Sequence, residues 1–293
     1  LYIADQYRIM KWAPGANEGV KVAGTGTSGS SNSHIYPSKV IVDSSENIYV
    51  LDEGNHRIMK FESGISEGTI VAGGNGRGLA LNQLDNPRSF DIDSSGNIYI
   101  ADRINKRIMK WEPGASQGTV FASIGSWIWD IKVGPDGYIY VSGYSNIQRF
   151  NPQTKEQEEY FYTAQHASSS EMTFDWDSSG NFYVTDSEKD RVLRWGPDVK
   201  RDNPVTEPTV LIGGNGDGSG NNQLNQPQGI HIDFLGNLYV PDFYNHRVQK
   251  VNNIPNITIA AGATTGTITF TGIQDTTDEA DETIIVTPST SPT

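Results

Sequence analysis

A motif of 19 residues recurs along this chain, and it constrains the fold more than any other feature. The clearest copy reads Asp-Ser-Ser-Gly-Asn-Ile-Tyr-Ile-Ala-Asp over residues 93–102 and continues as Arg-Ile-Met-Lys-Trp over 107–111. One tyrosine is shared by all the copies, at Tyr2, Tyr49, Tyr99, Tyr140, Tyr183 and Tyr239. These tyrosines are 41 to 56 residues apart. Such a period is typical of repeat folds in which each unit packs against its neighbours.

Each copy predicts four short antiparallel strands. An apolar stretch such as residues 89–92 comes first, and a Gly-Asn turn leads into the tyrosine-bearing strand, which is rich in β-branched and aromatic residues. Residues 107–111 and 70–74 represent the third and fourth strands. The 31 Gly and 14 Pro agree with this interpretation, because both residues disfavour helix interiors. Four strands in about 40 to 50 residues is the signature of a propeller blade. We therefore expect an all-β fold, a six-bladed β-propeller with incomplete first and last blades.

The motif resembles the NHL family of β-propellers, which is named for an Asn-His-Leu triplet after the Asp-bearing turn. Here the triplet reads Asn55-His56-Arg57 and Asn245-His246-Arg247, with Arg in place of Leu. The resemblance covers residues 1–251 and implies a propeller over that range. We expect residues 252–293 to form a separate, short C-terminal β extension.

Paired charges recur at one position of the motif. Asp and Arg are five residues apart in four copies: Asp52/Arg57, Asp102/Arg107, Asp186/Arg191 and Asp242/Arg247. In the copy around Tyr140 both are absent, and Gly143 and Asn146 take their places. This joint loss predicts an ion pair across one hairpin, in which Asp also accepts N–H groups of its turn. Because an active site is needed only once, the repetition favours a structural role over a catalytic one.

The chain begins in the middle of a copy. The first copy lacks its leading strand and the last lacks its fourth. We expect the missing strands to lie upstream of Leu1, so that this fragment has an open or strained seam.

The composition changes after Val251. Residues 254–293 contain no Lys or Arg, and residues 256–259 and 266–270 alternate like paired strands. This stretch resembles the later half of a Calx-β domain, an extracellular β-sandwich module whose acidic loops often bind Ca²⁺. A cluster of carboxylates suits this hard cation; its members are Asp275, Asp278, Glu279, Asp281 and Glu282. The alternative interpretation is a solvated acidic turn.

Histidines define the enzymatic alternative. The NHL family includes peptidyl-amidoglycolate lyases, which use zinc bound by histidines from several blades. His231 lies between Ile230 and Ile232 in a predicted first strand, where it faces away from both. The matching residues of other copies are Asp91, Lys132 and Asp175, while His56 and His246 are predicted turn residues. Three convergent histidines would have to come from mismatched positions, so this alternative is not favoured.

Aromatic residues suggest a binding surface. Trp12, Trp111 and Trp195 share one motif position with Phe61 and Phe150, which predicts packing between blades. Trp127 and Trp129 have no such counterparts, and we expect them on one face of a strand, as core filling or as a patch for sugar stacking or peptide binding. Deviation from the repeat makes this copy the candidate for specificity.

Charge and composition exclude several function classes. The chain has 22 Lys and Arg against 35 Asp and Glu, a net charge of −13, which argues against nucleic-acid binding. No apolar run approaches the roughly 18 residues of a membrane span. The favoured function is a non-enzymatic scaffold in a secreted or cell-surface, multidomain bacterial protein. Its propeller face would bind a protein or glycan, and the alternative is a metal-dependent lyase or hydrolase with its site in the channel.

Overall fold

The structure, a computed structural model, describes residues 1–143, 146–162, 172–196, 207–252, 266–269 and 283–286. The chain divides into two compact units, Leu1–Tyr162 and Thr163–Thr293. The described secondary structure is β-strand apart from two short 3₁₀ turns, η1 (Glu53–Asn55) and η2 (Phe243–Asn245).

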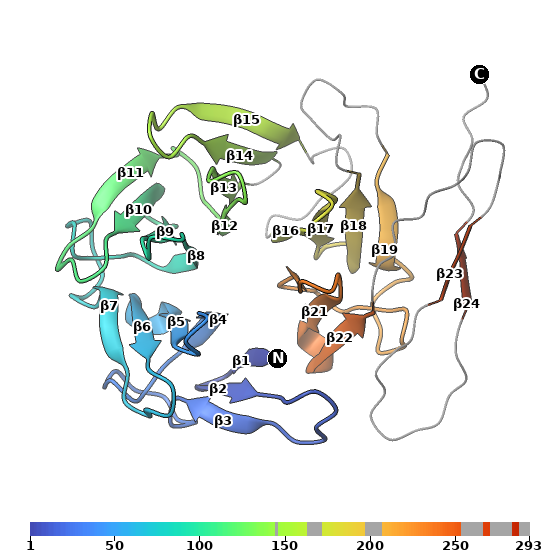
Figure 1. Cartoon of the computed structure of the whole chain (residues 1–293), viewed down its shortest axis with the longest axis horizontal. Helices are drawn as coiled ribbons and strands as arrows, with labels where there is room; N and C mark the ends of the chain where they lie inside the picture. The colour runs from blue at the N-terminus through green and yellow to red at the C-terminus, as the bar shows by residue number, and fades with distance from the viewer. Residues whose placement is uncertain (144–145, 163–171, 197–206, 253–265, 270–282, 287–293) are drawn as a thin grey trace. The chain divides into compact units, whose positions relative to one another are not determined.

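The first unit contains four antiparallel sheets, and within each the strands follow one another in chain order (Figure 1). Blade 1 has three strands: β1 (Tyr2–Asp5), β2 (Arg8–Lys11) and β3 (Val20–Ala23). Blade 2 comprises β4 (Pro37–Val42), β5 (Ile48–Asp52), β6 (Arg57–Phe61) and β7 (Thr69–Gly73). Blade 3 comprises β8 (Pro87–Ile92), β9 (Ile98–Asp102), β10 (Arg107–Trp111) and β11 (Thr119–Ser123). Blade 4 comprises β12 (Asp130–Val133), β13 (Ile139–Ser142), β14 (Asn146–Phe150) and β15 (Gln157–Tyr162).

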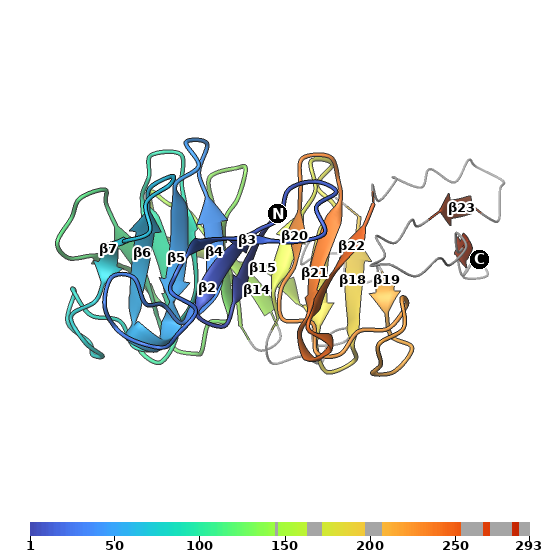
Figure 2. The same cartoon turned by 90° about the horizontal axis from the view of Figure 1, so that it is seen from below.

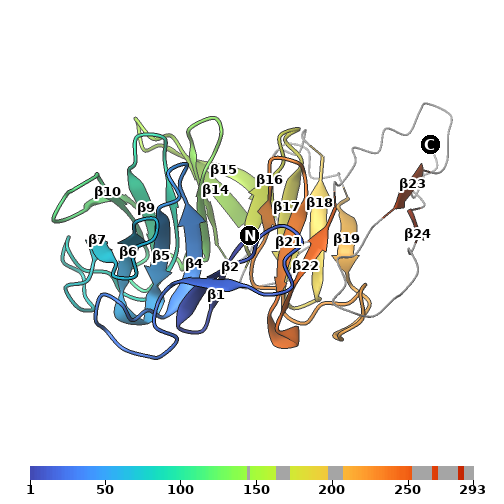
Figure 3. The same ribbon diagram turned by 60° about the horizontal axis from the view of Figure 1, so that its bottom comes forward.

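The second unit contains two further blades (Figure 3). Blade 5 comprises β16 (Phe174–Trp176), β17 (Phe182–Asp186), β18 (Arg191–Trp195) and β19 (Thr209–Gly213). Blade 6 has three strands: β20 (His231–Ile232), β21 (Leu238–Asp242) and β22 (Arg247–Val251). A separate antiparallel pair joins β23 (Gly266–Thr269) to β24 (Thr283–Val286). The predicted strand at residues 256–259 lies outside the described residues.

The six sheets correspond to the six copies of the motif, and the fold is a six-bladed β-propeller with mostly four-stranded blades. The predicted incomplete copies are the three-stranded first and last blades. Register is repeated as well, because the motif tyrosine lies in the second strand of blades 2 to 6 and in β1 of the three-stranded blade 1. Tyr99, for example, pairs with Asp91 of β8 and Lys110 of β10.

The hydrophobic core lies between blades. One cluster joins Leu51 and Ile58 of blade 2 to Phe90, Ile100 and Trp111 of blade 3. Large aromatic residues at the shared motif position are buried as predicted; they are Phe61, Trp111, Phe150 and Trp195. Trp12 of blade 1 differs, since it is only partly buried. Because each sheet buries its face against the next, a single blade has no core of its own.

The repeated Asp and Arg residues form the predicted ion pairs. The Arg Nε to Asp Oδ2 distance is 2.7 Å for Arg57–Asp52, 2.6 Å for Arg107–Asp102, 3.0 Å for Arg191–Asp186 and 2.7 Å for Arg247–Asp242. Burial raises the pKa of the Asp102 carboxyl, while bonds from Asn105, Arg107 and the Asp85 N–H act in the opposite direction. All four carboxylates are fully buried, which fits a structural role.

The partners of these pairs correct one prediction. Asp52 accepts hydrogen bonds from the side-chain amide of Asn55 in its 3₁₀ turn, at 2.9 and 3.0 Å, but none from a backbone N–H of that turn. It accepts instead from the backbone N–H of Tyr36, just ahead of β4, and Asp102 accepts likewise from Asp85 N, at 2.7 Å each. Arg107 donates to the carbonyl oxygens of Leu79, Ala80 and Gln83. The pair therefore fastens the segment that leads into the blade to the hairpin turn, because the N–H and C=O groups of that segment need partners.

Alternating strand direction gives each blade two distinct ends (Figure 2). The segment that leads into the first strand and the turn between the second and third strands lie at the same end, which we call the leading end. In the first unit β4 lies against β1 and β8, and β8 lies against β12. Loops from neighbouring blades 2, 3 and 4 therefore meet at their leading ends.

Candidate functional site

The two tryptophans singled out in the sequence lie outside the strands. Trp127 and Trp129 lie in the segment between β11 and β12, and the strand begins only at Asp130. The expectation that they share a strand face was wrong, because this segment carries the chain from blade 3 to the leading end of blade 4. The two rings nevertheless lie edge to face, with centroids 6.2 Å apart and an interplanar angle of 80°. Trp129 is 5% exposed, whereas Trp127 is only partly buried.

Two arginines of blade 3 complete an aromatic–arginine cluster of Arg88, Arg103, Trp127 and Trp129. The guanidinium carbon of Arg103, in the turn between β9 and β10, lies 4.8 Å from the ring centroid of Trp127 and 4.3 Å from that of Trp129. The guanidinium carbon of Arg88, in β8, lies 5.9 Å from the Trp129 centroid. Stacking of guanidinium on indole is favourable and fixes both groups.

Hydrogen bonds from blades 2 and 3 hold this cluster in place. Arg88 Nη1 lies 3.4 Å from Glu53 Oε2 in the turn between β5 and β6. Arg103 Nη1 donates to Asn86 Oδ1 at 3.3 Å, and the backbone N–H of Asn86 donates to His56 Nδ1 at 3.1 Å. His56 is in the left-handed conformation that ends η1, with φ of 55°, so the prediction of a turn residue is confirmed. The fold thus presents two indoles and two guanidinium groups at one leading end.

Sequence reasoning identified the tryptophans but missed the arginines. Trp127 and Trp129 deviate from the repeat within one short stretch, and this deviation was the signal. Arg103 is more than 20 residues away in the sequence and belongs to a copy that otherwise follows the motif. A signal for it did exist, since the same turn position holds Glu53, Ser187 and Phe243 in other copies.

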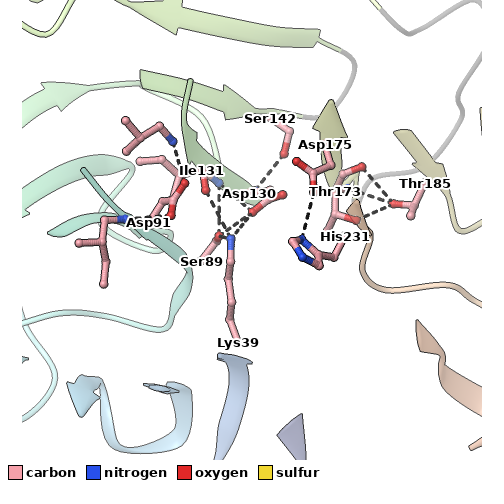
Figure 4. Close-up of polar contacts among 12 residues, drawn as sticks. Lys39, Ser89, Asp91, Asp130, Ile131, Ser142, Thr173, Asp175, Thr185 and His231 are labelled. Carbon is pink, nitrogen blue, oxygen red and sulfur yellow. Dashed lines mark hydrogen bonds and ion pairs between the residues drawn. The ribbon is translucent and has the colours of Figure 1, made fainter. Parts of the chain in front are cut away.

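A polar network links the first strands of blades 2, 3 and 4 (Figure 4). Lys39 Nζ lies 3.0 Å from Asp130 Oδ1 and donates to Ser89 Oγ at 2.8 Å. Ser89 Oγ in turn donates to Asp130 Oδ1 at 2.6 Å, and Ser142 Oγ accepts from Asp130 N at 2.9 Å. These residue types occur in nucleophilic sites, but Ser89 is 2% exposed and its hydroxyl is already occupied. The network ties three blades together and was not predicted, because Lys39 and Asp130 are 91 residues apart.

Two residues at the motif position of His231 have the same structural task. Asp91 Oδ2 accepts from Val133 N of blade 4 at 2.8 Å, and in the second unit Asp175 Oδ2 accepts from Ile232 N of blade 6 at 3.1 Å. Each carboxylate satisfies a backbone N–H on the first strand of the next blade. A first strand is the edge of its sheet, so its free N–H groups need such acceptors.

His231 itself faces away from the core, as predicted. Its side chain is 65% exposed, whereas Ile230 and Ile232 are each 8% exposed. Its Nδ1 lies 3.4 Å from Asp175 Oδ2 (Figure 4). Its ring stacks on Tyr239, with centroids 6.5 Å apart. Within the second unit, the structure therefore places one carboxylate and one phenol beside this imidazole.

The predicted metal ligands cannot be placed. Asp275, Asp278, Glu279, Asp281 and Glu282 lie outside the described residues. Within the parts of the chain that the structure does describe, no three His, Asp or Glu side chains gather as metal ligands would. Nor is any helix in those parts long and apolar enough to cross a membrane.

Tyrosines of the second strands are held by the turns that precede them. Tyr140 donates to Asp136 at 2.7 Å and Tyr183 to Asp177 at 2.9 Å. Burial, together with the Asp93 carboxylate, raises the pKa of Tyr99 to about 12. Tyr99 therefore remains a neutral phenol around neutral pH.

Comparison with known proteins supports the fold. The model of the NHL repeat matches residues 35–61, and no curated protein matches the chain. An auxiliary nutrient binding protein from Bacteroides ovatus ATCC 8483 is similar over 74% of this chain and 59% of its own, at 20% identity and a TM-score of 0.53. A structural genomics protein of unknown function from Bacteroides thetaiotaomicron VPI-5482 is similar over 85% of this chain and 65% of its own, at 15% identity and a TM-score of 0.59. The chain thus spans less than two thirds of either protein, and at such identities the likeness concerns the fold.

Proposed function

We propose that this protein is a non-enzymatic binding protein that takes up a glycan at the aromatic–arginine cluster. The observation that carries the proposal is the pair of edge-to-face indoles beside a guanidinium at the leading ends of blades 3 and 4. The fold does not require them: where blade 4 has Trp129, the corresponding positions of blades 2, 3 and 6 hold Ser38, Arg88 and Gln228. A side chain that deviates from its repeat without a structural need is a candidate for function.

The chemistry of the cluster favours a sugar ring. Rigid aromatic side chains supply a large contact area at low entropic cost, and the apolar face of a pyranose packs well on an indole. Trp129 is buried and supports the partly exposed Trp127, which would form the contact. Similarity to a protein described as an auxiliary nutrient binding protein agrees with uptake of a small saccharide. A protein partner at the same surface is the competing proposal.

Calorimetric titration with a panel of neutral and acidic oligosaccharides tests this function. We expect at least one glycan to bind, and Trp127→Ala to weaken it about ten-fold or more, as removal of a central aromatic contact does. Phe234→Ala is the matched control, since this aromatic side chain is 91% exposed in the turn after β20, away from the leading end of its blade. Absence of binding by every glycan, or equal affinity of Trp127→Ala and the wild type, would reject the proposal.

His231 is proposed as a separate contact residue in the second unit. Its exposed imidazole stacks on Tyr239 and lies next to Asp175, an arrangement that suits a polar ligand group. We expect His231→Ala to leave binding at Trp127 unchanged if the two surfaces act separately. A loss of the same binding would reject His231 as a separate contact residue.

The proposal extends to a secreted or cell-surface protein whose residues 252–293 form a Calx-β-like segment. The acidic residues between Asp275 and Glu282 are then a Ca²⁺ site. Ca²⁺ at 100-fold its dissociation constant stabilises a folded protein by about 2.7 kcal/mol. We expect the melting temperature to rise with Ca²⁺ and to fall back with EDTA. A variant with Asp278→Asn and Asp281→Asn should lose this response, and an unchanged response would assign Ca²⁺ elsewhere.

A further inference from the structure

The charge of Arg103 has no counter-charge within the described chain. Its guanidinium donates one hydrogen bond within the described residues, from Nη1 to Asn86 Oδ1 at 3.3 Å. Nε is buried and has no hydrogen-bond partner among the described residues, and Nη2 makes no hydrogen bond with them. The remaining contacts of the guanidinium are the faces of Trp127 and Trp129. A guanidinium held by aromatic rings, with Nη2 still unused as a donor, is prepared to receive an anion.

The carboxylates around the β9–β10 turn are already engaged. Asp102 pairs with Arg107 at 2.6 Å, and Asp85 pairs with Arg77 at 2.7 Å. Glu53 lies 3.4 Å from Arg88. Lys106, the last residue of the turn, is exposed and forms no ion pair within the described residues. Two unmatched cations, Arg103 and Lys106, therefore stand in one four-residue turn.

This local excess of positive charge contrasts with the whole chain. The net charge is −13, so unmatched cations are not a general property of the surface. Nor does the fold require them. The position of Lys106 must tolerate a left-handed backbone, and it holds His56, Asp190 and His246 in other copies. The position of Arg103 holds Glu53, Ser187 and Phe243. A basic spot that neither the fold nor the overall composition explains points to a ligand with the opposite charge.

We infer that the aromatic–arginine cluster binds a saccharide that carries a carboxylate, a uronic acid residue within an oligosaccharide. The pyranose ring would lie on Trp127, and its carboxylate would accept a hydrogen bond from Nη2 of Arg103, with Lys106 nearby as a second cation. A planar guanidinium matches the geometry of a carboxylate and forms strong, charge-assisted bonds with it. This inference rests on the proposed function and names the class of glycan.

A matched pair of ligands isolates the carboxylate. Tetragalacturonate and its fully methyl-esterified form have the same backbone and differ in charge, and both are titrated into the whole chain by calorimetry. We expect the acid to bind roughly ten-fold more tightly or better, since a hydrogen bond to a charged group is worth at least that much. Added NaCl should weaken binding of the acid and leave the ester unaffected.

Variants assign the effect to named side chains. Arg103→Gln should remove the preference for the acid, Lys106→Gln should reduce it, and Arg103→Lys should retain part of it. Arg8→Gln is the control, because Arg8 is 46% exposed in β2 and belongs to an exposed pair with Asp5. Thermal melts establish that each variant is folded. If Arg103→Gln does not fold, Lys106→Gln and the salt series test whether the binding surface prefers the acid.

The outcomes separate this inference from the function on which it rests. Equal affinity for the acid and the ester, with both lost in Trp127→Ala, would overturn the inference of a uronate ligand and leave the proposal of glycan binding in place. Binding of no glycan, the two galacturonates and the oligosaccharide panel included, with Arg103-dependent binding of a polyglutamate peptide, would overturn both and indicate a protein partner. A preference for the acid that survives in Arg103→Gln and Lys106→Gln would also overturn the assignment.

Discussion

The same Asp–Arg pairing has very different surroundings in different blades, so its energetic value should differ too. Asp102 is fully buried, accepts from Arg107 at 2.6 Å and satisfies the N–H of Asp85. Asp102→Ala would leave a buried guanidinium and a buried N–H without their acceptor. Removal of one partner of such a pair costs about 3–5 kcal/mol. We expect the free energy of unfolding, measured by denaturant titration, to fall by about this amount.

Blade 1 supplies the matched control. Asp5 pairs with Arg8 at 2.7 Å across a shorter turn, and the two side chains are 38% and 46% exposed. An exposed pair contributes about 0–1 kcal/mol, because water solvates both charges well. Asp5→Ala should therefore change stability little. Equal losses in Asp5→Ala and Asp102→Ala would show that burial does not set the value of the motif.

The pKa of Tyr99 predicts alkaline destabilisation. Burial, reinforced by the Asp93 carboxylate, raises the pKa of this phenol to about 12, whereas tyrosine in an unfolded chain ionises near pH 10. Between these values the unfolded state loses a proton that the folded state keeps, so the stability present below pH 10 is lost as the pH rises towards 12. Melting temperatures measured from pH 9 to 12 should fall less steeply for Tyr99→Phe than for the wild type. Parallel curves for the two proteins would contradict the assignment.

At the scale of the strands, loss of a carboxylate that links the first strands of two blades should affect only the strand that it contacts. Asp91 Oδ2 accepts from Val133 N at 2.8 Å, and Asp91→Ala would leave that N–H without an acceptor at a cost of about 1–3 kcal/mol. Asp91→Asn keeps an oxygen at the same place and should be close to the wild type. Amide hydrogen exchange at Val133 should therefore accelerate in the alanine variant only. Acceleration in both variants would mean that the charge, and not the acceptor, is needed.

The contrast between local and distant contacts also explains what the sequence could predict. The strands of Ile98–Asp102 and Arg107–Trp111, and the Asp102–Arg107 pair between them, depend on residues a few positions apart, so the motif alone was sufficient. Lys39 and Asp130, or Arg103 and Trp127, meet only because blades pack side by side. A sequence repeat predicts that the blades are similar. It does not predict which side chains of two neighbouring blades contact each other.

At the scale of the whole molecule, the position of the core between blades has a consequence for unfolding. Phe90 of blade 3 is fully buried in the cluster that includes Leu51 and Ile58 of blade 2. Phe90→Ala should lower the free energy of unfolding by about 3–5 kcal/mol, through lost burial and the cavity that remains. Because the removed ring belongs to the core of both blades, the loss should be shared between them.

Native-state hydrogen exchange distinguishes a shared loss from a local one. In Phe90→Ala, amides of β5 and β6 should lose as much protection as those of β9 and β10. Val120→Ala is the control, since this side chain is 36% exposed on the outer strand of blade 3, and it should change neither pair of strands. Protection lost in β9 and β10 alone would mean that blades open singly. Opening of any one of blades 2, 3 and 4 would then disrupt the aromatic–arginine cluster, because the cluster depends on residues from all three.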